Sequence, residues 1–142
     1  MKKVVVIGQG YVGLNLAVSA AKNFRIIGFD VNESLISNLK QGKSHIEDIS
    51  DSALNIVMKN SSYIPTCNLE DIKDADIYVI AVPTPLDKNR QPELSYVLNA
   101  AETISKVSNE PALIINESTS YPGTLRDVIK QNIEKKSDVV HH

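Results

Sequence analysis

The sequence predicts an α/β protein with a doubly wound parallel sheet of about six strands. Short apolar runs alternate along the chain with segments whose apolar residues recur at helical spacing, which is typical of parallel sheets. The runs are apolar at consecutive positions, as in strands buried on both faces. A chain of 142 residues, 42% hydrophobic and 23% charged, has the length and composition of one globular domain.

The first expected unit is a strand, a glycine turn, a helix and a second strand. Residues 4–7 are a β-branched run, which predicts a strand. Glycines follow at once, and over residues 12–21 the apolar positions recur at the spacing of one helix face. Residues 26–29 predict the second strand, which ends at Asp30.

The middle of the chain continues the alternation. Asn32 or Ser34 is placed to cap a helix that Gly42 ends, and Ser50 or Asp51 is placed to cap another. The expected elements are a helix to about residue 40, a helix over 50–59, a strand over 63–66, a helical turn over 69–73 and a strand over 77–82.

The last part follows a break at Pro83 and Pro85 and a polar loop. We expect a helix over 95–107, a strand over 112–115, a helix over 124–136 and the start of a strand at 139–140. The strand order should be 3-2-1-4-5-6. Because the chain stops within or just after the last strand, we expect residues 1–142 to be the N-terminal domain of a longer protein. The terminal His141 and His142 are assigned no chemistry.

The glycine turn predicts a phosphate-binding loop. Gly8, Gln9, Gly10, Tyr11, Val12 and Gly13 fit G-x-G-x-x-G between a strand and a helix. The first glycine permits the turn, the second lets a pyrophosphate approach the backbone, and the third lets the helix pack closely. The N–H groups of the helix N-terminus attract the phosphates. The alternative is a turn that merely connects strand to helix.

Asp30 predicts which dinucleotide binds. It lies about 20 residues after the turn, at the end of the second strand, where an acid accepts hydrogen bonds from the adenosine ribose. The next residues, 31–34, include no Arg or Lys that would neutralise a 2′-phosphate. We therefore expect NAD rather than NADP, bound in a Rossmann fold. The alternative is that Asp30 simply ends a strand.

Loops after the fourth and fifth strands belong to the same edge of the predicted sheet. Val82, Pro83 and Thr84 follow one strand, and Glu117, Ser118 and Thr119 follow the other. Ligands bind at this edge, so we expect these residues near the nicotinamide. The alternatives are an ordinary proline turn and a plain helix N-cap.

Other residues and the charge suggest no further chemistry. Cys67 has no local partner to stabilise a thiolate and is expected to be a packing residue, and His45 a solvated one. Tyr11 either covers the phosphates or packs on its helix. No metal site is expected. A net charge of −2 and the absence of a long apolar segment indicate no nucleic-acid or membrane partner, and one cysteine fits the cytoplasm.

Taken together, these motifs resemble the UDP-glucose/GDP-mannose dehydrogenase family over nearly the whole chain. The similar features are Gly8 to Leu14, Asp30, Gly42 to Ser44, Ala75 and Asp76, Val82 to Pro85, Ser118 and Thr119, and Pro122 and Gly123. Residues 83–95 and 117–124 resemble the branch that oxidises UDP-N-acetylglucosamine or related sugars. Asn15, Gln91, Glu93 and Ser120 depart from the family's usual residues.

The resemblance implies an oxidoreductase of polysaccharide biosynthesis. Such an enzyme oxidises C6 of a UDP-sugar to the acid with two NAD, through a thiohemiacetal and a thioester on a cysteine. That nucleophile belongs to a region outside this chain. The resemblance carries over Gly8 to Gly13, Asp30, Thr84 and Thr119 for the cofactor, with Thr119 also helping to position water, and places Glu117 near the nicotinamide. We expect the full-length protein to be a homo-oligomer.

Two other functions share the glycine motif. One is another NAD enzyme, such as a β-hydroxyacid dehydrogenase, and the other is an NAD-sensing regulatory domain of a channel or transporter. The loops at 82–85 and 121–124 argue against the first, and the hydroxyl cluster expected at the nicotinamide end argues against the second.

Overall fold

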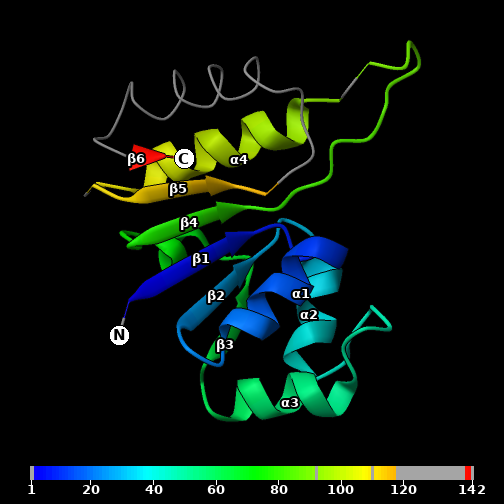
Figure 1. Ribbon diagram of the computed structural model, residues 1–142, viewed down its shortest axis with the longest axis vertical. Coiled ribbons are helices and arrows are strands. Elements are labelled where there is room, and N and C mark those ends of the chain that lie inside the picture. Colours follow the sequence, from blue (N-terminus) through cyan, green and yellow to red (C-terminus); the bar gives the residue numbers. More distant parts are fainter. Residues whose placement is uncertain (1, 92, 110, 118–139, 142) are drawn as a thin grey trace.

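The computed structural model describes residues 2–91, 93–109, 111–117 and 140–141. It contains a six-stranded sheet with the order β3-β2-β1-β4-β5-β6 (Figure 1), which confirms the predicted order. The strands are β1 (Lys3–Ile7), β2 (Arg25–Phe29), β3 (Tyr63–Thr66), β4 (Ile77–Ile80), β5 (Leu113–Asn116) and β6 (Val140–His141). Every neighbouring pair is parallel.

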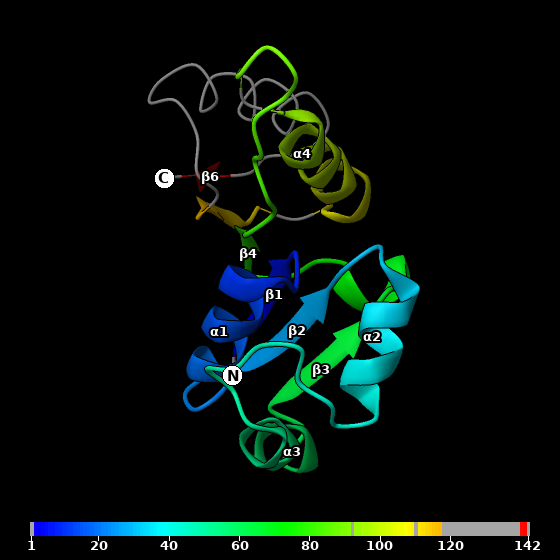
Figure 2. The same cartoon turned by 90° about the vertical axis from the view of Figure 1, so that its right-hand side faces the viewer.

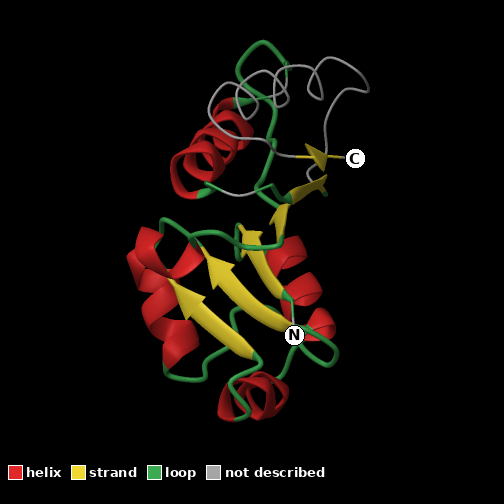
Figure 3. Ribbon diagram, turned by 90° about the vertical axis from the view of Figure 1, so that its left-hand side faces the viewer, coloured by secondary structure: helices red, strands yellow, loops and turns green. Residues whose placement is uncertain are grey.

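The helices divide into two groups along the sheet. They are α1 (Tyr11–Ala20), α2 (Glu33–Lys40), α3 (Asp51–Lys59), the 3₁₀ helix η1 (Leu69–Ile72) and α4 (Ser95–Val107). Figure 2 shows α4 at the end of the sheet formed by β4 to β6, and α2 and α3 at the end formed by β2 and β3. Figure 3 shows helices on both sides of the strands, as a doubly wound sheet requires.

Successive residues of β1 pack into two separate cores. Val4 and Val6 join Leu14 of α1 and Leu54 of α3 in one cluster. The alternate residues of β1, Val5 and Ile7, join the other cluster, which contains Val97, Ala100 and Ile104 of α4 and the Tyr78 ring. The consecutive apolar run seen in the sequence therefore marks the middle of the sheet, where both faces are covered.

Caps and strand ends follow the local chemistry, with one difference. Asn32 accepts from Leu35 N at 3.1 Å and Ser50 from Ala53 N at 3.0 Å, so each is the N-cap of its helix. The strand predicted over 77–82 pairs only to Ile80. Ala81 N still donates to Ile7 O at 2.8 Å, but β1 then turns away at Gly8, and the ladder ends.

The remaining expectations concern the chain after β5. The helix predicted over 124–136 lies outside the described residues. The last strand is present as β6, one residue later than predicted. None of the helices in the described ranges is long and apolar enough to span a membrane.

Candidate functional site

The glycine turn has the shape of an anion-binding site. Gly8 has φ +98°, and a Cβ there would lie 2.7 Å from Ala81 O. A Cβ on Gly13 would lie 1.7 Å from Gly8 O, whereas one on Gly10 meets no atom within 4 Å. The first and third glycines are therefore required by the protein itself. The second faces open space, which is the room that a pyrophosphate needs.

The start of α1 leaves its N–H groups available. Gly10 is the N-cap and provides no side-chain hydrogen bond, and the first turn contains no acidic residue. The first N–H groups of a helix have no partner within the helix, and the N-terminus carries a partial positive charge. An uncapped N-terminus beside open space fits a phosphate group.

Asp30 is held at the carboxyl end of β2 by two backbone amides. Its Oδ2 accepts from Gln9 N at 2.8 Å, and its Oδ1 accepts from Asn32 N at 2.9 Å. Each carboxylate oxygen can accept more than one hydrogen bond. The carboxylate is thus fixed in orientation and retains the capacity to accept from the two hydroxyls of a ribose.

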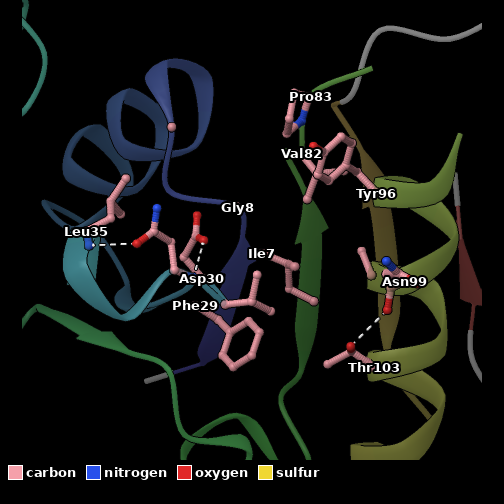
Figure 4. Close-up of a pocket in the computed structure, with 14 residues that line it drawn as sticks. Ile7, Gly8, Phe29, Asp30, Leu35, Val82, Pro83, Tyr96, Asn99 and Thr103 are labelled. Atoms are coloured by element: carbon pink, nitrogen blue, oxygen red, sulfur yellow. Dashed lines mark hydrogen bonds between the residues drawn. The ribbon is translucent and has the colours of Figure 1, made fainter. Parts of the chain in front are cut away.

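A cavity of about 430 Å³ opens beside this carboxylate (Figure 4). Such a volume is typical of small-molecule sites. Its walls come from the carboxyl ends of β1, β2 and β4 and from one face of α4. The lining residues are Ile7, Gly8, Gly10, Phe29, Asp30, Val31, Asn32, Leu35, Val82, Pro83, Tyr96, Asn99, Ala100 and Thr103. Mostly apolar walls with an acid at the edge fit an adenosine.

Sequence reasoning missed the α4 wall of this cavity. Figure 4 shows Tyr96 beside Val82, and Asn99 and Thr103 further along the same helix. The spacing of these positions predicts a helix but indicates no contact with a ligand. The signal that could have identified them is polar Asn99 and Thr103 on the face that also carries Ala100.

A second cavity of about 240 Å³ adjoins the glycine turn and is lined in part by the loops after β4 and β5. It is lined by Gly10, Tyr11, Val12, Ala81, Val82, Pro83, Thr84 and Glu117. Glu117 N donates to Ile80 O at 2.8 Å, which holds the two loops together. The structure therefore brings Thr84 and Glu117 to the N-terminus of α1, while Ser118 and Thr119 lie outside the described residues.

The polar side-chain groups of Gln9 and Tyr11 form hydrogen bonds with other groups of the protein. The Gln9 side chain is fully buried and bonded inside the protein, and its backbone N–H holds Asp30. Tyr11 is largely exposed, and its hydroxyl donates to Asp48 in the loop before α3. This hydrogen bond and the negative charge of Asp48 raise the pKa of the Tyr11 hydroxyl.

The position of Cys67 differs from the prediction that it packs inside the protein. It is exposed, just beyond β3 at the edge of the sheet, so the prediction of a packing cysteine is wrong. The chain leaves the strand at Thr66, whose Oγ1 bonds Asp71 and Asn68 N, and this turn directs the next residue outward. His45 is exposed, as predicted.

The strand order, the glycine turn, Asp30 and the cavity beside it define a dinucleotide-binding domain of the Rossmann type. Residues 2–141 match the UDP-glucose/GDP-mannose dehydrogenase family, NAD binding domain. The chain belongs to this family and is its NAD-binding domain. The match favours this family over the β-hydroxyacid dehydrogenase and regulatory-domain alternatives.

Individual proteins that are similar to this chain support the family assignment. The chain is 40% identical over 139 residues to Protein CapL of Staphylococcus aureus, covering 98% of this chain and 32% of that protein. It is 37% identical to a UDP-N-acetyl-D-glucosamine 6-dehydrogenase of Pseudomonas aeruginosa, covering 95% of this chain and 31% of the relative. The structure of a UDP-D-ManNAc dehydrogenase from Pyrococcus horikoshii superposes with a TM-score of 0.86 at 30% identity, over 98% of this chain and 35% of that one. The chain thus spans about a third of these relatives.

Proposed function

We propose that this domain serves an NAD-dependent UDP-sugar 6-dehydrogenase whose substrate is a UDP-N-acetylhexosamine, with the glucosamine form first. The observation that carries the proposal is the uncapped N-terminus of α1 beside open space at Gly10, with Asp30 oriented next to it. The sugar is inferred from the names of relatives, which include a UDP-N-acetyl-D-glucosamine 6-dehydrogenase.

Each part of the site has a role in this proposal. The backbone N–H groups of residues 10–13 hold the pyrophosphate, and Asp30 accepts from the ribose hydroxyls. Val82, Pro83, Thr84 and Glu117 surround the nicotinamide end, with Ser118 and Thr119 following Glu117. Bound NAD supplies the acceptor for the hydride that leaves C6 of the sugar. Thr119 helps to position the water of the later hydrolysis.

The nucleophile that holds the aldehyde belongs to the rest of the protein. Cys67 follows β3, and β2 and β1 separate β3 from β4. At about 4.8 Å per strand, this places the thiol well over 10 Å from the loops after β4 and β5. A reacting thiol must approach within about 3–3.5 Å of its carbon. Cys67 is therefore excluded from this role in the proposal.

We place residues 1–142 as one domain of a longer, homo-oligomeric protein. An exposed, unpaired Cys67 fits a reducing compartment, so we place the protein in the cytoplasm.

The test uses the full-length protein, with NADH formation followed by absorbance. UDP-N-acetylglucosamine, UDP-N-acetylmannosamine, UDP-glucose and GDP-mannose are compared at equal concentration. We expect the highest kcat/KM with the first of these and two NADH per sugar. A clear preference for UDP-glucose or GDP-mannose contradicts the proposed substrate.

A further inference from the structure

A buried set of hydrogen bonds connects the edge strand β3 to Asp30. The Tyr63 hydroxyl donates to Gln9 Oε1 at 2.6 Å, and Gln9 Nε2 donates to Gly8 O at 2.9 Å. Gln9 N donates to Asp30 Oδ2 at 2.8 Å. Gly8 O and Gln9 N belong to the same peptide unit. The connection therefore runs from a tyrosine, through two amide groups, to the carboxylate that faces the ribose.

The direction of every bond in this chain is determined. Gln9 Nε2 also donates to Val6 O at 3.1 Å, and backbone carbonyls can only accept. The amide nitrogen must therefore face these carbonyls, and Oε1 must face Tyr63, which has to donate. Burial, and secondarily the charge of Asp30, raises the pKa of the Tyr63 hydroxyl, which keeps this donor protonated.

The two amides are aligned head to tail. The Gly8–Gln9 peptide is trans, so its C=O and N–H point in opposite directions. Its oxygen receives the Gln9 side chain, and its N–H faces the carboxylate. Hydrogen bonds in such a chain polarise one another, and here each places its positive end toward Asp30.

The surrounding backbone leaves room for this arrangement only because of glycine. A Cβ on Gly28 of β2 would lie 2.4 Å from Gln9 Oε1 and 2.7 Å from Tyr63 Cε1. Gln9 and Tyr63 are both fully buried. Three separate parts of the chain thus accommodate one amide side chain. A turn that only connected a strand to a helix would not need this buried amide side chain.

We propose that Tyr63 and the Gln9 side chain are positioning residues that orient Asp30 and thereby set the preference for NAD over NADP. This inference rests on the proposed ribose-binding role of Asp30. With the Gly8–Gln9 peptide held at both ends, Asp30 stays where it attracts a 2′-hydroxyl and repels a 2′-phosphate. With the peptide free to rotate, both effects weaken.

The experiment measures NAD and NADP affinity of the 142-residue chain by calorimetry, with folding checked by circular dichroism. Tyr63→Phe removes the first donor and keeps the ring. We expect NAD affinity to fall about tenfold, as if one hydrogen bond between the Asp30 carboxylate and the ribose were lost, and NADP affinity to change less. The NAD-to-NADP ratio should therefore fall. Gln9→Met, which keeps the length but lacks the amide, should act in the same direction.

Tyr78→Phe is the matched control. Tyr78 is also fully buried in the sheet, and its hydroxyl donates to Ile72 O at 2.7 Å, but it packs in the other core. Its loss should lower stability and leave the ratio unchanged. In an Asp30→Ala background, Tyr63→Phe should no longer alter the ratio, because the carboxylate through which it acts is absent.

The outcomes separate this inference from the proposed site. If unmutated protein prefers NAD and Tyr63→Phe moves the ratio no more than Tyr78→Phe does, the positioning role is wrong and the ribose contact stands. If Asp30→Ala itself leaves NAD affinity unchanged, the assigned role of Asp30 fails, and this inference fails with it.

Discussion

Gly8, Gly10 and Gly13 share one motif but differ in what surrounds them. Gly8 has a positive φ and Gly13 lies against Gly8 O, so both are required for α1 to follow β1 so closely. Gly10 faces open space. The motif therefore combines residues needed for folding with one needed for the ligand, and substitutions should separate them.

Gly10→Val should retain the fold and lose NAD binding, since the new side chain takes the space assigned to the pyrophosphate.

Gly13→Ala should instead destabilise the protein by more than about 3 kcal/mol, because its Cβ meets backbone that cannot move without displacing α1. Thermal unfolding and calorimetry with NAD measure both effects. NAD binding by a well-folded Gly10→Val protein would show that the pyrophosphate lies elsewhere.

Asp30→Ala should weaken NAD binding by about 1–3 kcal/mol, the range for hydrogen bonds to a charged group. Asn32 is exposed, so its amide can bond water instead, but Gln9 is fully buried and its amide loses its acceptor. Stability should therefore fall as well, by about 1–3 kcal/mol. Titration calorimetry of both proteins at one ionic strength provides the comparison. Tighter binding of NADP than of NAD by the unmutated chain would contradict the assigned role of this carboxylate.

On the scale of the elements, β3 does more than pair with β2 at the edge of the sheet, because one of its side chains supports the glycine turn. Tyr63 crosses Gly28 of β2 to reach the residue that follows Gly8, so β3, β2 and the turn after β1 are joined by one side chain. The opposite core has its own buried tyrosine, Tyr78, bonded to η1. Both hydroxyls must be neutral to remain buried without cost.

Stability should consequently fall at alkaline pH. Burial raises the pKa of Tyr63 in the folded protein above its unfolded value of about 10. Above that pH the unfolded chain loses a proton that the folded one keeps, so the free energy of unfolding decreases by about 1.4 kcal/mol per pH unit for this group. Urea unfolding across this range should show a shallower decrease for Tyr63→Phe. An identical slope would mean that Tyr63 titrates normally.

On the scale of the whole molecule, the sheet places the candidate cofactor site and the single cysteine at different positions. The cavity beside Asp30 and the one beside Thr84 adjoin at the carboxyl ends of the central strands, while Cys67 lies beyond the edge strand. The described part of the chain thus has the parts for holding a dinucleotide and no thiol near its reactive end.

The 142-residue chain should therefore bind NAD without producing NADH from any UDP-sugar. Cys67→Ser should leave NAD affinity unchanged, since the thiol is exposed and far from the site. Calorimetry and an absorbance assay on the same preparation test both statements. NADH formation by this chain that disappears in Cys67→Ser would overturn the site assignment.

Local patterns were sufficient for much of this protein. The strand order follows from the alternation of strands and helices along the whole chain, which is typical of the dinucleotide-binding fold. The structure selects Asn32 and Ser50 from the two predicted pairs of caps. The element ranges, those pairs of caps and the different roles of Gly8 and Gly13 follow from runs, spacings and turn residues that lie within a few positions of one another. Such features are local because backbone geometry and capping act between near neighbours.

Only the tertiary structure could decide which distant residues meet. Tyr63 and Gln9 are separated by 54 positions, and no pattern in either segment indicates that they bond. The α4 wall of the cavity, the contact of Tyr11 with Asp48 and the exposure of Cys67 were missed for the same reason. Each depends on how strands order and helices pack around them, whereas the glycine motif and Asp30 were recognisable because their chemistry requires a set spacing along the chain.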